Sequence, residues 1–208
     1  MDNLKVKSSY NIDKWFPDTI YITKDVCNYL LPSLEKSAKK IAEEKGTIKS
    51  PSLWVNSTHR TASFEIKKIH PFDILTDYIK YHVTNYLNEL GYFNKRLHII
   101  NMWFNISDEG DFNFPHSHPG SFISGVFYIK APKNTVIQFY DTNRMIGNVL
   151  PADDSNNYLS YDLVRYECQT GMLMLWLSNF VHGNPRQCVE GEKIAVSFNI
   201  DVGKNYDD

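Results

Sequence analysis

The sequence predicts a mainly β domain of the jelly-roll class, with N-terminal helices packed against one of its sheets (an α+β fold). Two segments before residue 95 repeat apolar side chains at helical spacing, and about eight short segments after it are rich in β-branched and aromatic residues. Helices that precede a run of antiparallel strands are expected to support one layer of a two-layer core. The 208 residues are therefore expected to form one domain, with residues 1–95 as a helical buttress and residues 96–208 as the jelly-roll core.

The two helical segments are residues 26–45 and 72–90. In each, apolar residues recur every three or four positions, as on one face of an amphipathic helix. Gly46 and Gly91 follow these segments, and glycine is the residue that most often ends a helix.

Glycine and proline residues separate the segments that have strand composition. The predicted strands are residues 97–106, 113–118, 122–130, 135–141, 159–167, 171–177, 180–186 and 193–201. Two polar stretches are predicted to be loops at the mouth of the jelly roll: residues 50–61, which contain His59 and Arg60, and residues 142–158, a flap too long for a simple hairpin. Because these loops are expected to contact the substrate, the sequence does not identify it.

Charge and cysteine content argue against several classes of protein. Lys+Arg number 22 and Asp+Glu number 24, so no overall basic field attracts nucleic acid. The three cysteines are widely separated and form no CxxC motif, which favours free thiols in a reducing cytoplasm over a disulfide framework. No apolar run approaches the roughly 18 residues of a membrane-spanning helix, and no N-terminal signal segment is present. We therefore expect a soluble, cytoplasmic protein.

Three histidines carry the chemistry that the sequence predicts. His116 and His118 are two positions apart in a predicted strand, and side chains at that spacing project from the same face. One metal ion can therefore contact both, and His182, from a distant strand, can supply a third ligand. Three protein ligands leave coordination positions open for water, O2 or a co-substrate, which is typical of catalytic metal sites. An isolated His-x-His pair is a weak indication of a metal site, so the neighbouring residues must decide whether the site is expected.

Further motifs surround these histidines. The stretch from Trp103 contains W-F-N, then H-S-H-P-G-S, and then S-G-V-x-Y ending at Tyr128. Residues 171–183 read G-M-L-M-L-W-L-S-N-F-V-H-G, and residues 193–199 read K-x3-S-F-N. Together, over residues 98–200, these motifs resemble a family of 2-oxoglutarate–Fe(II) oxygenases found in marine bacteria and their phages.

The resemblance implies a double-stranded β-helix, the cupin-like form of the jelly roll, with Fe(II) held by His116, His118 and His182. It also implies a dioxygenase, of the hydroxylase type, that decarboxylates 2-oxoglutarate to succinate and uses O2 to oxidise a small-molecule or peptide substrate. Most of the wider superfamily has a carboxylate where this chain has His118, but imidazole also binds iron. A phage-encoded member would act in the cytoplasm of its host.

The resemblance also implies residues that bind 2-oxoglutarate. Where the family has an arginine on the last strand for the far carboxylate, this chain has Lys193, which keeps the charge but loses the bidentate geometry. Arg186 or Arg165 could take its place. Tyr128 resembles the tyrosine that binds a co-substrate carboxylate in related oxygenases. Further polar contacts to the co-substrate are expected from two side chains, Asn105 and Ser197.

Several alternatives remain open on the sequence alone. His118 could lie outside the coordination sphere, with Asp141 or water as the third ligand. The protein could also be a cupin-type, three-histidine dioxygenase that needs no 2-oxoglutarate, or a non-catalytic jelly-roll module that binds a metal. Trp103 and Trp176 are expected in the hydrophobic core, because their strands are apolar. The oligomeric state is unknown.

Overall fold

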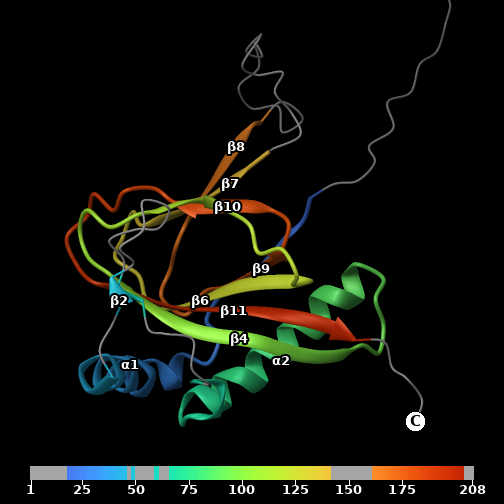
Figure 1. The fold of residues 1–208 in the computed structure, drawn as a ribbon, viewed down its shortest axis with the longest axis horizontal. Helices are drawn as coiled ribbons and strands as arrows, with labels where there is room; N and C mark the ends of the chain where they lie inside the picture. The colour runs from blue at the N-terminus through green and yellow to red at the C-terminus, as the bar shows by residue number, and fades with distance from the viewer. Residues whose placement is uncertain (1–17, 46–47, 50–58, 61–65, 142–160, 204–208) are drawn as a thin grey trace, which may run out of the picture.

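The structure, a computed structural model, describes residues 18–45, 48–49, 59–60, 66–141 and 161–203. Its strands form two antiparallel sheets that face each other (Figure 1). The larger sheet has the order β1 (Ile20–Thr23), β9 (Leu173–Leu177), β6 (Ile123–Lys130), β11 (Lys193–Gly203), β4 (Arg96–Ser107), β3 (His59–Arg60) and β2 (Ile48–Lys49). The smaller sheet has the order β5 (Asn113–His116), β10 (Val181–Asn184), β7 (Val136–Tyr140) and β8 (Leu163–Glu167).

Helices cover the outer face of the larger sheet. In Figure 1, α1 (Leu31–Lys45) and α2 (Phe72–Glu89) lie beneath β4 and β11. Leu34 of α1 and Ile79 of α2 are fully buried in one cluster with Phe104, Phe127 and Phe198 of the sheet. Each such side chain contributes about 1.5–3 kcal/mol on burial, so the helices are part of the core, as the sequence predicts.

The first helix begins later than its apolar spacing suggests. Asp25 and Cys27 have positive φ angles of 57° and 46°, and a 3-10 helix, η1 (Asn28–Leu30), precedes α1. Pro32 accounts for this boundary, because proline has no N–H and fits only the first turn of a helix. The second helix follows another 3-10 helix, η2 (Ile66–Lys68), and agrees with its predicted range to within one residue.

Each of the eight segments with strand composition contains a strand, β4 to β11 in chain order, so the predicted jelly roll is confirmed. Three strands of two to four residues, β1 to β3, were not predicted because such short segments carry almost no periodicity. Of the predicted loop 50–61, the structure describes only His59–Arg60, which form β3 and pair with β4. The predicted flap, residues 142–158, lies outside the described residues.

A second apolar cluster fills part of the space between the two sheets. Alternate residues of a strand point to opposite faces, so Val126 and Tyr128 of β6 enter this cluster, whereas Phe127 between them faces the helices. On β11 the inward face carries Lys193 and Ser197 as well as apolar residues, and both of these polar residues line a cavity. Among the described residues, no helix is both long and apolar enough to cross a membrane.

Candidate metal centre

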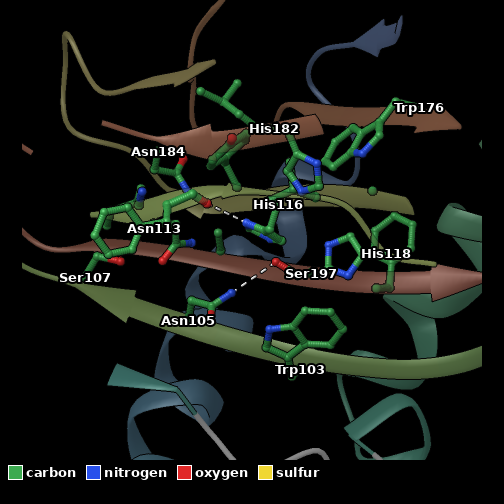
Figure 2. Close-up of a pocket in the computed structure, with 18 residues that line it drawn as sticks. Trp103, Asn105, Ser107, Asn113, His116, His118, Trp176, His182, Asn184 and Ser197 are labelled. Carbon is green, nitrogen blue, oxygen red and sulfur yellow. Dashed lines mark hydrogen bonds between the residues drawn. The ribbon is translucent and has the colours of Figure 1, made fainter. Parts of the chain in front are cut away.

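The smaller sheet brings His116 and His182 together directly. They are cross-strand partners on β5 and β10, and their ring centroids are 4.6 Å apart. The His118 ring lies 5.0 Å from that of His116 and 5.1 Å from that of His182 (Figure 2). One potential ligand atom from each ring lies within 4.8 Å of the others, so the three side chains could hold one metal ion. Within the described part of the chain, Asp141 is not a member of this cluster.

Backbone carbonyls orient two of the three rings. His116 Nδ1 lies 2.7 Å from the carbonyl oxygen of Phe114, and His182 Nδ1 lies 3.0 Å from that of Phe180. A carbonyl only accepts hydrogen bonds, so Nδ1 is the protonated nitrogen in both rings and Nε2 keeps its lone pair for a metal. Burial, followed by the charges of His116 and His118, lowers the pKa of His182 to about 3, so this ring is neutral at physiological pH.

His118 reaches the centre differently from the sequence prediction. A shared strand was expected for His116 and His118, but β5 ends at His116. Pro119 follows at once, and Gly120 has a φ of +89°, so the chain turns away from the sheet here. The backbone N–H of His118 instead donates to the carbonyl of Ser178 at 2.8 Å. The turn therefore brings this ring back toward the other two without strand geometry.

Gly183, next to His182, permits the close approach of β5 and β10. A Cβ atom at this position would lie 2.8 Å from the Asn113 carbonyl oxygen and 3.1 Å from the Pro115 nitrogen. Because both contacts are with backbone, a side chain could be accommodated only by moving the strand that carries His116. The V-H-G motif thus combines a histidine with the glycine that this packing requires.

The three histidines line a cavity of about 280 Å³ between the sheets. This volume is just below the usual range for ligand sites, about 300–1,000 Å³. Four of the residues expected to bind the co-substrate line the same cavity, and they are Asn105, Tyr128, Lys193 and Ser197. Asn105 Nδ2 donates to Ser197 Oγ at 3.0 Å, which is one of the dashed lines in Figure 2.

The two arginines considered as substitutes for Lys193 lie elsewhere. Arg186 lines a second cavity, of about 200 Å³, rather than the cavity with the histidines. Arg165 is the cross-strand partner of Gln138 in the smaller sheet and does not line the histidine cavity. Lys193 is therefore the one cation among the described residues that line the histidine cavity.

Lys193 is a buried cation without an opposite charge in contact. Only 6% of the residue is exposed, and no described carboxylate lies within ion-pair distance of its ammonium group. Burial lowers the pKa of Lys193, an effect that Cys168 and Asp111 partly oppose. A buried unpaired charge is costly, so this side chain is suited to an anionic ligand.

Two further donors in the cavity lack a partner. The hydroxyl of Tyr128 and the indole Nε1 of Trp176 are buried, and neither makes a hydrogen bond of good geometry within the described structure. Burial, and then the neighbouring Cys168, raises the pKa of Tyr128 well above its usual value, so its proton stays on the oxygen. The Trp176 nitrogen points into the space between the rings of His182 and His118 (Figure 2).

Trp103 and Trp176 are buried, as the sequence predicts, but both also line the cavity. The Trp176 ring centroid lies 4.6 Å from that of His182, and the Trp103 centroid lies 6.2 Å from that of His118. Inward alternation on the L-M-L-W-L strand was the signal that could have identified Trp176.

Residues 101–199 match the model of a family described as "Putative 2OG-Fe(II) oxygenase". The match covers 99 of the 208 residues, and this segment resembles a 2-oxoglutarate–Fe(II) oxygenase domain. It contains the three histidines and all the described residues that line their cavity. No curated protein sequence matches the chain.

Solved structures share the fold of this chain at low sequence identity. A prolyl-4-hydroxylase from Pseudomonas putida is 9% identical with a TM-score of 0.62, and the match covers 88% of this chain and 92% of that one. HygX from Streptomyces hygroscopicus, solved with nickel and 2-oxoglutarate, is 11% identical with a TM-score of 0.62, over 91% and 84% of the two chains. A Trichoplax adhaerens prolyl hydroxylase with a peptide fragment is 9% identical with a TM-score of 0.63, over 88% and 83%. The predicted double-stranded β-helix is thus confirmed.

Proposed function

We propose that the protein is an Fe(II)- and 2-oxoglutarate-dependent dioxygenase of the hydroxylase type, acting on a small-molecule or peptide substrate. One observation carries this proposal: three histidines, a buried unpaired lysine and two unpartnered donors face the same small cavity. Metal ligands and anion-binding groups in one cavity suit a co-substrate that chelates a metal at one end and carries a carboxylate at the other.

His116, His118 and His182 are the proposed iron ligands. Neutral imidazole suits Fe(II) among several metals, and two of the rings are oriented by their Nδ1 hydrogen bonds. When bound, the iron would supply O2 activation, with 2-oxoglutarate decarboxylated to succinate as the substrate is oxidised. Three neutral ligands leave the centre more positive than a site with a carboxylate, which favours a dianionic co-substrate.

Lys193 is the proposed partner of the far carboxylate of 2-oxoglutarate. The dianion would replace a buried unpaired cation with an ion pair, and it would accept hydrogen bonds from Tyr128 and Trp176. Relieving an unsatisfied buried donor is worth about 1–3 kcal/mol. Asn105 and Ser197, which already bond to each other, would contact the co-substrate along its length.

The apolar walls of the cavity have a separate proposed role. Val126, Ile137 and Ala195 line it beside the polar groups, and they would exclude water from the region around Lys193. In a dry cavity, the attraction between Lys193 and a carboxylate is stronger than it would be in water.

An anaerobic titration tests the proposal. Adding Fe(II) and then 2-oxoglutarate to the protein should produce a weak visible charge-transfer band, and His182→Ala should abolish it by removing a ligand. A protein that binds Fe(II) but gives no band with 2-oxoglutarate would contradict the proposal.

Succinate release separates the two oxygenase alternatives. Oxidised product formed without succinate would instead support the cupin-type reaction that needs no 2-oxoglutarate. A metal-loaded protein that turns over no oxidisable substrate with O2, whether or not 2-oxoglutarate is present, would support the non-catalytic module.

We also propose that the chain acts as a single domain in a reducing cytoplasm. The three cysteines, Cys27, Cys168 and Cys188, are all free thiols, which supports that compartment. In the solved relatives, the partner is a peptide fragment in one case and hygromycin B in another, so both substrate classes are proposed for this chain.

A further inference from the structure

A row of four polar side chains, three of them buried, crosses the inner face of the larger sheet beside the metal centre. It runs from the end of β9 through β6 and β11 to β4, and its members are Ser178, Ser124, Asn199 and Asn101. Ser124 and Ser178 are each 1% exposed, and Asn199 is 5% exposed. Asn101 is half-buried. Buried polar groups are costly unless their hydrogen bonds are made, so the three buried members of the row need a reason.

The hydrogen bonds of this row share one direction. Asn199 Nδ2 donates to Asn101 Oδ1 at 2.9 Å, and Ser124 Oγ donates to Asn199 Oδ1 at 2.7 Å. Because a serine hydroxyl has one proton, Ser124 must accept the third bond, from Ser178 Oγ at 2.8 Å. Ser178 is therefore the first donor of a continuous chain, in which each bond polarises the next.

Every polar group of Ser178 is engaged. Its hydroxyl donates to Ser124, its N–H donates to the carbonyl of Phe122 at 3.0 Å, and its carbonyl accepts the N–H of His118 at 2.8 Å. Phe122 is itself fixed, because its N–H donates to the carbonyl of Ile200 at 3.0 Å. His118 lies outside the strands, so Ser178 supplies a backbone contact that a strand would otherwise provide.

The same turn also serves a second histidine. Residues 177–180 close a turn in which the N–H of Phe180 donates to the carbonyl of Leu177 at 2.9 Å. The carbonyl of Phe180 then orients the ring of His182 through its Nδ1. One turn thus holds the backbone of His118 on one side and the ring of His182 on the other.

We propose that Ser124, Ser178 and Asn199 are positioning residues of the metal centre. Their hydrogen bonds fix the turn after β9, and this turn holds His118 against His116 and His182. The inference rests on the proposed function, since it concerns the same metal. It also gives a role to the S-G-V, L-S-N and S-F-N motifs, whose Ser124, Ser178 and Asn199 do not line the cavity.

A double-mutant cycle with Co(II) as the probe tests this inference. Anaerobic titrations, followed by visible absorption of bound Co(II), would compare wild type, Ser124→Ala, His118→Ala and the double variant. Loss of a residue that orients a ligand typically costs 10–100-fold in metal affinity, so Ser124→Ala should raise the Kd about tenfold or more. In the His118→Ala background the same change should add almost nothing, because Ser124 acts through His118. Ser124→Thr, which keeps the hydroxyl, should restore most of the affinity.

Thr76→Val provides a matched control, because it also removes a buried hydroxyl, here one that donates to the Phe72 carbonyl in α2 at 2.8 Å. It should lower the free energy of unfolding without changing the Kd for Co(II). An equal loss of affinity with and without His118, or no loss in Ser124→Ala, would overturn the inference. If Ser124→Ala does not fold, Ser178→Ala tests the same chain from its other end. A wild-type chain that binds no Co(II) would instead contradict the proposed function.

Discussion

Lys193 is a residue whose charge depends on its burial. Burial lowers its pKa below the ordinary value of 10.5, so the ammonium group loses its proton as the pH rises through this lowered pKa. Affinity for 2-oxoglutarate should therefore be full below that pH and fall above it. The stability of the ligand-free protein should change in the opposite sense, because the buried charge that opposes folding is removed over the same range, up to pH 10.5.

Calorimetry of 2-oxoglutarate binding to the Co(II)-loaded protein, from neutral pH upward toward the ordinary lysine value of 10.5, would measure this dependence. Lys193→Arg is the matched control, since arginine keeps its charge throughout the range. The affinity of this variant is expected to be lower but independent of pH. If the affinity of the wild type for 2-oxoglutarate varied with pH in the same way as that of Lys193→Arg, a group other than Lys193 would control the pH dependence.

Trp176 carries a second prediction at this scale. Trp176→Phe keeps an aromatic ring beside His182 and removes the unpartnered indole N–H. A hydrogen bond to a charged group is worth about 1.5–3 kcal/mol, so the Kd for 2-oxoglutarate should rise at least tenfold while the Kd for Co(II) stays the same. Equal losses for both ligands would indicate that the ring only packs against His182.

At the scale of elements, an ion-pair cluster joins α1 to the turn before β11. Lys39 lies 2.8 Å from Glu35 of the same helix and 2.9 Å from Glu192, and Lys130 contacts both carboxylates at 3.3 and 3.8 Å. The hydrogen bond from Lys39 is the main cause of the lowered pKa of Glu35. Because Glu192 precedes Lys193 directly, the helix supports the strand that carries the proposed co-substrate cation.

Removing Lys39 should have a small effect that depends on salt. Lys39 is 41% exposed, and exposed pairs contribute about 0.2–1 kcal/mol. We expect Lys39→Ala to lower the free energy of unfolding by less than about 1 kcal/mol in dilute buffer, and by less again near 1 M salt. Urea denaturation with Lys40→Ala as the control, whose pair with Glu44 stays within α1 at 3.6 Å, would test this. Equal losses of unfolding free energy in the two variants would show that the ion pair between Lys39 and Glu192 does not stabilise the fold.

The elements themselves could be predicted because their patterns are local. Apolar spacing identifies both helices, and Gly46 and Gly91 mark their ends, although Pro32 moves the start of α1. Strand composition locates eight strands, whereas β1 to β3 exist only through pairing with distant residues. Local sequence does not encode such pairing.

At the scale of the whole molecule, the sequence predicts which side chains form the metal centre, but it does not predict which backbone elements bring them together. His116, His118 and His182 converge as expected, yet His118 does so through a turn held by Ser178, far away in sequence. The choice among Lys193, Arg165 and Arg186 depends on which of these side chains lines the histidine cavity, which the sequence leaves open. The unpartnered nitrogen of Trp176 is visible only once its surroundings are assembled.

The pairing of β5 has a consequence for the lifetime of the protein. Among the described residues, this four-residue strand at the edge of its sheet pairs with β10 alone, and exposed edges are where strands separate and aggregate. An ion shared by His116 and His182 would cross-link the edge to its neighbour. Added metal should therefore slow hydrogen exchange at the β5 amides and raise the melting temperature with concentration. A hydrogen-exchange rate at the β5 amides that does not change with added metal would refute this prediction. The concentration of metal in the cell would thus determine how long each protein molecule stays folded, in addition to whether it is active.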